Sequence, residues 1–408
     1  MVEFRERPKE GIPKVLSTPA EFAAAAARLQ AGTGAFAIDT ERASGYRYDD
    51  RAFLIQIRRR GAGTMLFAPE GHRAELTQAL APVLNGQHWI IHAAPSDLPS
   101  LGWLGLFPGT LFDTELAARF AGFHRTNLGA IIAELLDVQL EKGHGDDDWS
   151  IPQLSEEMRA YAALDVELLL ELATTLRDIL AEQEKLEWMV EECAAIVAKH
   201  AHDTAPQPGS WRDIKGVSSL KNGKQRAAAQ SLWNLRDDIS RRTDTAPGRV
   251  LPNKVLVEIA RVLPSTQPQL TRIKGFPRRR KGAAQRWLRA VQQSQKIPPR
   301  GRPGALREER TVPSKSVWSR EYPELWEEYQ QIRAAVGDIA EELGLPSELL
   351  LRPATLRAAV WAAIGGSGTI SQPDDVPAFL EHEGARPWQV TLVAPVLIES
   401  LFPNQIKR

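Results

Sequence analysis

Four acidic residues and one tyrosine in the first half of the chain have the types and spacing of a phosphodiester-cleaving site. Asp39 and Glu41 end an apolar run, GAFAIDTER, that predicts a strand, and residues i and i+2 of a strand share a face. Tyr161 and Asp165 lie in YAALDVELLL, whose spacing predicts a helix, where residues i and i+4 are neighbours. Asp97 follows HWIIH, a second predicted strand, where a helix should begin.

Acids that converge at the end of a sheet repel each other unless divalent cations lie between them. Hard cations such as Mg²⁺ and Mn²⁺ prefer carboxylate oxygens as ligands. Two such cations side by side stabilise both the attacking and the leaving oxygen of a phosphodiester. The sequence therefore predicts a hydrolase that uses two divalent metal ions, Mg²⁺ or Mn²⁺, and no organic cofactor.

At these residues the chain resembles the DEDD family of 3′–5′ exonucleases, in its tyrosine-containing branch, and is similar to ribonuclease D enzymes. The resemblance rests on DTE from Asp39 to Glu41, on the Asp97 segment and on YxxxD from Tyr161 to Asp165. It implies a ribonuclease-H-like fold and a role for each residue. Asp39 would bridge both metals, Glu41 and Asp165 would complete the site that activates water, Asp97 would hold the second metal, and Tyr161 would orient the attacking water.

Four neighbouring residues are expected to lie near the site without binding metal. Thr40 is expected to contact the end of the substrate or to belong to the core, and Gln56 to hydrogen-bond near the site or to fill an interstrand position. His92 is expected to be structural or to support the site indirectly, rather than to be catalytic. Asp113 resembles a family position that supports the fold, so we do not expect it to bind metal.

One segment departs from the family pattern. The loop before the third motif is usually basic in ribonuclease D enzymes, but here it reads GHGDDDWSIPQL, with Asp146, Asp147 and Asp148 in place of basic charge. We interpret these aspartates as a solvated loop tip rather than as a further cation site. The sequence therefore does not predict how this loop binds the substrate strand.

Length and composition limit the remaining possibilities. The 408 residues predict about two to four domains, and 43% hydrophobic with 25% charged residues is typical of a soluble globular protein. The N-terminus lacks the apolar stretch of a signal peptide, and EFAAAAARLQ is too short to span a membrane, so no membrane association is expected. The single cysteine, Cys193, excludes an internal disulfide and fits a cytoplasmic location.

The net charge of zero conceals a strong segregation of charge. Residues 205–310 contain 24 Lys and Arg against 7 Asp and Glu, a net charge of +17. Residues 1–204 have a net charge of −12 and residues 311–408 a net charge of −5. A basic segment beside an acidic metal site is what a nuclease needs, because one part holds phosphates while the other collects cations.

The pattern of apolar residues divides the chain into four parts. Residues 1–204 alternate predicted strands (GAFAID, LIQIR, GTMLFA and HWIIH) with helices, which indicates a mixed α/β sheet; after FDTELAARFAG only helices are expected. Helices are predicted in two further parts, residues 205–295 and residues 317–408. Both resemble HRDC domains, the second in degenerate form. Residues 296–316, rich in proline, glycine and arginine, form a predicted linker. The fold class is thus a ribonuclease-H-like exonuclease domain followed by two all-α HRDC-like domains.

The segment RIKGFPRRRK is the strongest candidate for nucleic-acid binding. A glycine in a tight turn between helices lets backbone amides approach a phosphate, and the surrounding cations add charge. The alternative is a solvated basic helix end. The candidate residues are Lys274, Gly275, Arg278, Arg279, Arg280 and Lys281, with Arg241 and Arg242 widening the patch.

These features favour a monomeric, metal-dependent 3′–5′ exoribonuclease that removes nucleoside 5′-monophosphates from RNA 3′ ends. Its expected substrates are tRNA precursors or other structured RNA, in tRNA 3′ processing or RNA turnover. Two alternatives stay open: the same chemistry on single-stranded DNA, and a non-catalytic scaffold that binds nucleic acid. The intact set of four acids and a tyrosine argues against the scaffold.

Overall fold

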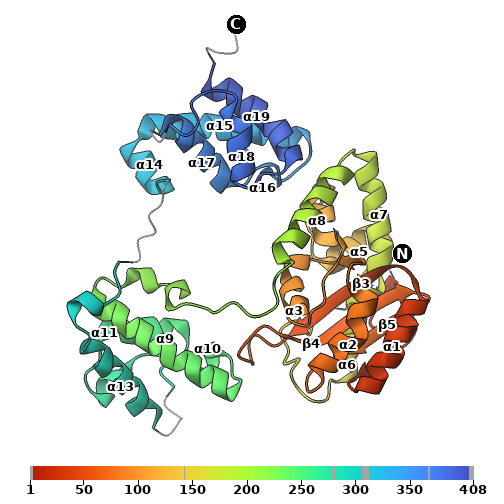
Figure 1. Cartoon of the computed structure of the whole chain (residues 1–408), viewed down its shortest axis with the longest axis horizontal. Coiled ribbons are helices and arrows are strands. Elements are labelled where there is room, and N and C mark those ends of the chain that lie inside the picture. Colours follow the sequence, from red (N-terminus) through yellow and green to blue (C-terminus); the bar gives the residue numbers. More distant parts are fainter. Residues whose placement is uncertain (1–2, 142, 278–281, 306–311, 366–367, 404–408) are drawn as a thin grey trace.

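The structure is a computed structural model of the chain. It describes all residues except 1–2, 142, 278–281, 306–311, 366–367 and 404–408. Figure 1 shows an N-terminal body built on a sheet, a first helical unit that follows it in the chain, and a second helical unit that contains the C-terminal helices. Among the described residues, none of the helices combines the length and the apolar character that a membrane span requires.

The N-terminal body is organised around a mixed sheet. In the described residues its six strands run in the order β2-β5-β4-β3-β6-β7. The central strand β3 pairs antiparallel with β4 and parallel with β6, and the four strands predicted from apolar runs are confirmed as β3, β4, β5 and β6. The bounds are β2 Val15–Leu16, β3 Thr33–Arg42, β4 Ala52–Arg60, β5 Gly63–Phe67, β6 His88–Ile91 and β7 Thr110–Asp113.

Long-range pairing creates strands that the sequence pattern did not predict. The edge strand β7 ends within FDTELAA, at Asp113, and pairs with β6. The prediction that only helices follow this segment is wrong, because β8 (Val138–Leu140) pairs in parallel with β1 (Glu3–Arg5) in a separate two-stranded sheet. A three-residue strand has no periodicity of its own, and β8 depends on a partner from the other end of the body.

Helices pack against this sheet and against each other. The helical stretch predicted from Ser155 towards Lys199 consists of three helices, with the first break at Leu168. Beside that break the buried Glu167 accepts hydrogen bonds from Arg5 and from the backbone of Lys9, which ties the N-terminal segment to this point. The bounds are α1 Pro19–Ala31, α2 Arg73–Leu84, α3 Leu98–Gly102, α4 Thr114–Phe120, α5 Leu128–Leu136, α6 Glu156–Glu167, α7 Leu169–Glu182 and α8 Leu186–His200, with the 3-10 turn η1 at Ala94–Ser96.

The first helical unit has a hydrophobic core of its own. Trp211, Leu232, Leu256 and Trp287 are among its buried side chains, and the long helix α9 contacts both α11 and α13. Asn222 caps α9 by accepting a hydrogen bond from the backbone of Gln225. The bounds are η2 Trp211–Asp213, η3 Val217–Ser219, α9 Gly223–Thr243, α10 Pro247–Val250, α11 Asn253–Val262, α12 Gln267–Arg272, α13 Ala283–Gln295 and η4 Pro299–Gly301.

The second helical unit shares one continuous hydrophobic core with the N-terminal body. Trp388 connects them: its ring stacks on Trp188 of α8 with centroids 5.2 Å apart and meets Phe120 of α4 edge-on at 5.4 Å. Its indole nitrogen donates a hydrogen bond to Glu192. The bounds are α14 Lys315–Glu321, α15 Pro323–Glu342, α16 Ser347–Leu350, α17 Pro353–Ile364, α18 Asp375–His382 and α19 Pro387–Leu401.

We expect Trp388→Ala to cost about 3–5 kcal/mol of stability, because it empties a buried indole site between two bodies. Val190→Ala on the same helix α8 is the control: Val190 is 53% exposed, and the change should stay within about 0.5 kcal/mol. Chemical denaturation of both full-length variants measures the difference. Equal midpoints for Trp388→Ala and wild type would contradict the shared core.

Candidate active site

Two carboxylates of the site come from the central strand β3. Asp39 lies opposite Gln56 and Glu41 opposite Leu54 in the register with β4. Because side chains alternate along a strand, both acids point to one face and Thr40 points to the other. Glu41 is only 8% exposed, while Asp39 remains partly exposed.

The third carboxylate comes from α6, which packs against β3 and β4. Ser155 caps this helix by accepting a hydrogen bond from the backbone of Met158, so the helix begins where the predicted pattern places it. Asp165 and Tyr161 lie one turn apart on it. Asp39, Glu41 and Asp165 each place a carboxylate oxygen so that the three atoms lie within 4.8 Å of one another.

Asp97 lies beside this group rather than within it. It precedes α3 and is 3% exposed. One of its oxygens accepts a hydrogen bond of 2.5 Å from the hydroxyl of Thr40 and lies 4.0 Å from the guanidinium of Arg42. Thr40 therefore fixes Asp97 from the opposite face of β3, a role that the sequence left open between substrate contact and core.

The turn that carries Asp97 is held by Asp113. After β6 the backbone passes through Ala93 in the left-handed region, with φ of 59°, which is uncommon for a residue with a side chain. The carboxylate of Asp113 accepts hydrogen bonds from the backbone of Ala93 and Ala94 on one side, and from Glu115 and Leu116 of α4 on the other. Asp113 thus supports the fold, as expected.

Two further neighbours have the contacts of supporting residues. His92 exchanges a hydrogen bond of 2.9 Å with Thr114, and burial lowers the pKa of His92 to about 4, so its ring is neutral at pH 7. The fully buried Gln56 directs its amide nitrogen to Glu41 at 3.5 Å. Gln56 therefore combines both roles expected for it, since it lies within the sheet and also contacts the site.

The proximity of the acids raises their pKa values. Burial raises the pKa of Asp165 to about 8, and the charge of Asp97 adds to the rise. Burial raises the pKa of Asp97 to about 6, although Arg42 and Thr40 oppose this. Burial and then the charges of the neighbouring acids raise the pKa of both Asp39 and Glu41 well above their ordinary values. The site therefore favours any species that brings positive charge to it.

Tyr161 adds a neutral hydrogen-bonding group. Burial raises the pKa of its phenol, and the charges of Asp165, Glu41 and Asp39 raise it further, so the hydroxyl keeps its proton. Its ring meets the ring of His144 edge-on at 5.8 Å and lies 6.3 Å from the ring of Trp149. Both partners belong to the loop before α6.

The three aspartates of that loop have local contacts. Asp147 pairs with His144 at 2.6 Å, and Asp148 accepts hydrogen bonds from the backbone and hydroxyl of Ser150. The backbone carbonyl of Asp146 lies 3.5 Å from the hydroxyl of Tyr46. These contacts agree with the interpretation of a loop tip. Trp149, which is 2% exposed beneath it, gave no signal in the sequence because a lone tryptophan has no diagnostic spacing.

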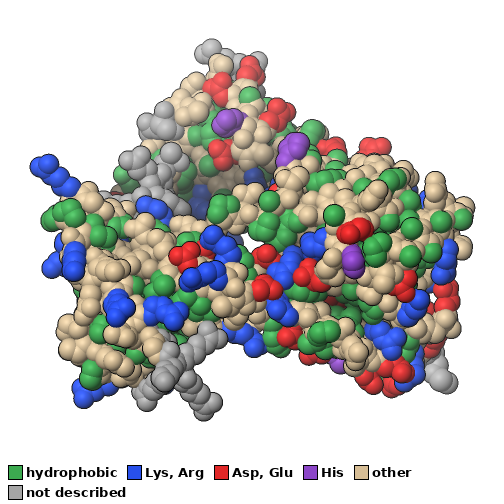
Figure 2. Space-filling view, turned by 60° about the horizontal axis from the view of Figure 1, so that its bottom comes forward, with side chains coloured by type: hydrophobic (Ala, Val, Ile, Leu, Met, Phe, Trp, Pro, Cys, Tyr) green, Lys and Arg blue, Asp and Glu red, His purple; other side chains and the backbone are tan. Residues whose placement is uncertain are grey.

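The basic residues expected to bind nucleic acid lie on the first helical unit. Lys274 is exposed, and Gly275 has φ of 82° in a turn so close to α11 that a Cβ atom would lie 3.2 Å from Val255. Arg242 is exposed, whereas Arg241 pairs with Asp237. Figure 2 shows lysines and arginines spread over this unit. The expected residues Arg278, Arg279, Arg280 and Lys281 lie outside the described residues.

Comparison with known proteins identifies the parts of the chain. Residues 13–181 match the family model described as 3′–5′ exonuclease, residues 225–291 match the HRDC domain, and residues 311–401 match a 3′ to 5′ exonuclease C-terminal domain. The last match differs in name from the degenerate HRDC-like domain expected there. The boundaries 1–204, 205–295 and 317–408 stay predictions.

Individual relatives agree with these matches. The ribonuclease D of Jannaschia sp. strain CCS1 is 30% identical over 297 residues, which cover 70% of this chain and 75% of the relative. Several other ribonuclease D enzymes align over about half of their own length. A protein of solved structure from Bifidobacterium adolescentis is 30% identical with a TM-score of 0.85, and the match covers 98% of this chain and 100% of that one.

The fold is also that of Escherichia coli RNase D, with a TM-score of 0.68 at 21% identity over 96% of this chain and 99% of that one. The mixed sheet, the following helical unit and the carboxylates of β3 and α6 define a 3′–5′ exonuclease. The chain belongs to the ribonuclease D family and is an exoribonuclease.

The pKa of Asp165 generates a prediction about proton release. At pH 7 a carboxyl group with a pKa of about 8 is mostly protonated, and a divalent cation binds its ionised form. Binding of Mn²⁺ or Mg²⁺ at pH 7 should therefore release protons, and the release should shrink as the pH rises above about 8. Titration calorimetry in two buffers of different ionisation enthalpy measures this. A binding heat that does not depend on the buffer at pH 7 would contradict it.

Proposed function

We propose that the chain is a metal-dependent exoribonuclease that removes nucleoside 5′-monophosphates one at a time from RNA 3′ ends with Mg²⁺ or Mn²⁺. The observation that carries the proposal is the group of Asp39, Glu41 and Asp165, whose oxygens lie within 4.8 Å of one another. Only hard oxygen ligands are offered, which suits these two cations. The raised pKa values express the same preference, since a cation would relieve the repulsion.

The donor set fits two cations that share Asp39. Glu41 and Asp165 lie with Asp39 in the 4.8 Å group, and Asp97, whose charge acts on Asp39, is held by Thr40. Asp39, Glu41 and Asp165 would hold one cation, and Asp39 with Asp97 the other. Bound there, the cations would supply the charge that activates water and stabilises the departing 3′ oxygen.

Tyr161 acts without holding metal. Its hydroxyl keeps its proton under the charges of Asp165, Glu41 and Asp39, and Tyr161 lies one helical turn from Asp165. A phenol in that state donates a hydrogen bond, which orients the water that attacks the last phosphodiester. Positioning of this kind contributes to catalysis by restricting the reacting geometry.

Structured RNA 3′ ends, including tRNA precursors, are the proposed substrate class. The E. coli RNase D that shares this fold is described as an exoribonuclease involved in structured RNA processing, which supports the class. The net charge of +17 over residues 205–310 supports a polyanion as partner. A cytoplasmic location and a monomeric state stay predictions from the sequence.

Digestion of end-labelled RNA tests the activity and its residues. With Mg²⁺ or Mn²⁺, wild type should release nucleoside 5′-monophosphates from a free 3′-hydroxyl. Asp39→Asn and Asp165→Asn should each lower kcat by about 10³-fold or more, because each removes charge from the ligand set. Tyr161→Phe should lose less, because it removes only a hydrogen bond.

A matched single-stranded DNA and a circular RNA are the control substrates. Slower cleavage of the DNA would agree with an exoribonuclease, since the 2′-hydroxyl is what distinguishes the two. Internal cuts in the circle, or wild-type turnover by Asp39→Asn, would contradict the proposal. Circular dichroism confirms that each variant is folded.

The first helical unit should contribute phosphate contacts for long RNA. Lys254, Arg272 and Lys274 are exposed near the Gly275 turn, and their triple alanine variant should bind single-stranded RNA with a shallower dependence on salt. Each lost phosphate contact should reduce the slope of log affinity against log salt by about 0.7. Fluorescence anisotropy over a series of salt concentrations measures the slope.

The control replaces three exposed cations of the acidic second helical unit, Lys315, Arg320 and Arg333, by alanine. The change in net charge is the same, so a general electrostatic effect would reduce both slopes equally. Equal slopes for the two triple variants would mean that the Gly275 turn is a solvated surface.

A further inference from the structure

Two loops join the first helical unit to the active site. The first, residues 43–51, connects β3 to β4 and is called the docking loop here. The second, residues 143–151, precedes α6 and is called the tyrosine loop, because it packs on Tyr161. The docking loop begins two residues after Glu41, and the tyrosine loop contacts Tyr161, so both loops border the carboxylate group.

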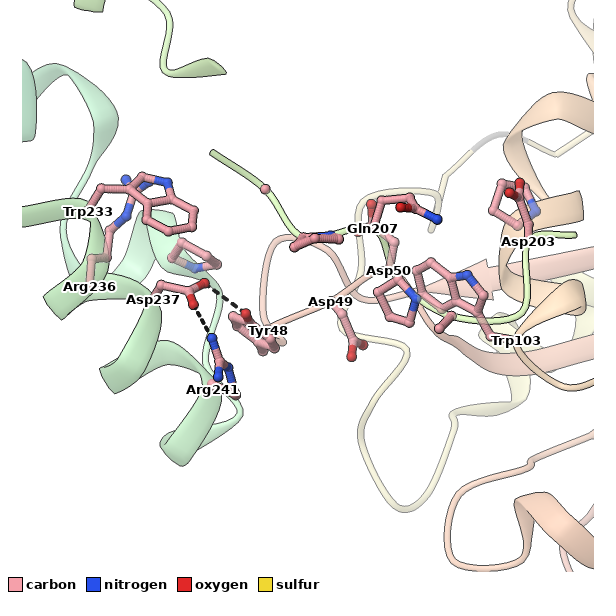
Figure 3. A pocket seen from close by; sticks show the side chains of 16 residues that line it. Tyr48, Asp49, Asp50, Trp103, Asp203, Gln207, Trp233, Arg236, Asp237 and Arg241 are labelled. Atoms are coloured by element: carbon pink, nitrogen blue, oxygen red, sulfur yellow. Dashed lines mark hydrogen bonds and ion pairs between the residues drawn. The ribbon is translucent and has the colours of Figure 1, made fainter. Parts of the chain in front are cut away.

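The docking loop contacts the first helical unit through several hydrogen bonds. Asp244, at the end of α9, accepts hydrogen bonds from both terminal nitrogens of Arg51 at 2.7 and 3.1 Å. The hydroxyl of Tyr48 donates to Asp237 at 2.7 Å (Figure 3). Arg249 donates to the carbonyl of Gly45 at 2.6 Å. These contacts combine charge with backbone groups, which fixes the path of the loop.

A cavity lies beside these contacts, between the N-terminal body and the first helical unit. A space of about 790 Å³ lies between the two bodies, lined by Asp50 and Trp103 of one and by Trp233 and Arg236 of the other (Figure 3). Side chains therefore do not fill the whole junction, and the docking loop carries much of the contact beside the cavity.

Arg47 extends this contact to the tyrosine loop. Its Nε donates a hydrogen bond of 2.6 Å to the hydroxyl of Ser150, and one terminal nitrogen donates to the Ser150 carbonyl at 3.3 Å. The other terminal nitrogen lies 3.4 Å from Asp244. The planar guanidinium of Arg47 thus binds Ser150 of the tyrosine loop through two nitrogens and Asp244 of the first helical unit through the third.

The tyrosine loop in turn limits where Tyr161 lies. The rings of His144 and Trp149 contact the Tyr161 ring, and a Cβ atom on Gly145 would lie 3.8 Å from the Tyr161 hydroxyl. Trp149 donates its indole hydrogen to the carbonyl of His144, which links the two loop residues whose rings contact Tyr161. Ser150 directly follows the buried Trp149, whose ring contacts the Tyr161 ring, so a shift at Ser150 would be transmitted to the phenol.

We propose that Arg47 is a positioning residue for Tyr161: by holding the tyrosine loop against the docking loop, it sets the hydrolytic rate. The inference rests on the proposed function, because it assigns the effect to the water-orienting phenol. The Arg47–Asp244 pair is partly exposed, with 36% and 38% of the side chains accessible, so its contribution is geometric more than energetic.

The test measures kcat and KM for an RNA trinucleotide, which is too short to need the basic unit. Full-length Arg47→Ala should lower kcat about tenfold and change KM less than about twofold. In a Tyr161→Phe background, Arg47→Ala should cause no further loss of kcat, because its effect passes through the missing hydroxyl. A purely structural loss would reduce both backgrounds equally.

Arg51→Ala is the matched control. Arg51 binds the same Asp244, but its ion-pair partners Asp49, Glu70 and Asp244 lie outside the tyrosine loop, so the kcat of Arg51→Ala should stay near wild type. An equal loss in Arg47→Ala and Arg51→Ala, or an undiminished Arg47 effect without the Tyr161 hydroxyl, would overturn the inference. Inactive wild type would overturn the proposed function itself, whereas Tyr161→Phe with wild-type kcat would overturn the role of Tyr161 and with it this inference.

Discussion

The repulsion between buried carboxylates is the constraint on which the N-terminal body depends. Asp39, Glu41 and Asp165 lie within 4.8 Å of one another, and burial with mutual charge raises their pKa values. Hydrophobic collapse alone would separate such groups, so the backbone must hold them. The central strand fixes two acids through pairing on both sides, and the capped helix α6 fixes the third. The apolar core stabilises the frame that keeps like charges together.

Local periodicity explains how much of this site the sequence could predict. The pairs Asp39 with Glu41 and Tyr161 with Asp165 follow from periods of two and of 3.6 residues, which involve only neighbouring positions. The four strands from β3 to β6 were predictable for the same reason. Asp97 differs, because its position depends on the left-handed turn at Ala93 and on distant hydrogen bonds. Its placement beside the group could not be read from spacing.

Contacts between distant segments left no periodic signal. The pairing of β1 with β8 and the stacking of Trp388 on Trp188 join residues more than a hundred positions apart. The sequence separated the second helical unit as an independent part, yet its core is continuous with that of the N-terminal body. Tryptophan and arginine residues of this kind look like ordinary core or surface positions until their partners are known. Arg47 and Trp149 escaped prediction for this reason.

At the docking contact, each body presents side chains whose charge is opposite in sign to its own net charge. Residues 1–204 have a net charge of −12, yet they present Arg47 and Arg51 at the junction; residues 205–310 have a net charge of +17, yet they present Asp237 and Asp244. The net charges attract the bodies at long range, while the reversed pairs select one register at short range. Because aspartates make the charged pairs, most lysines and arginines of this unit that the structure describes are not used there. They stay exposed, so docking leaves them available for the RNA contacts proposed for this unit.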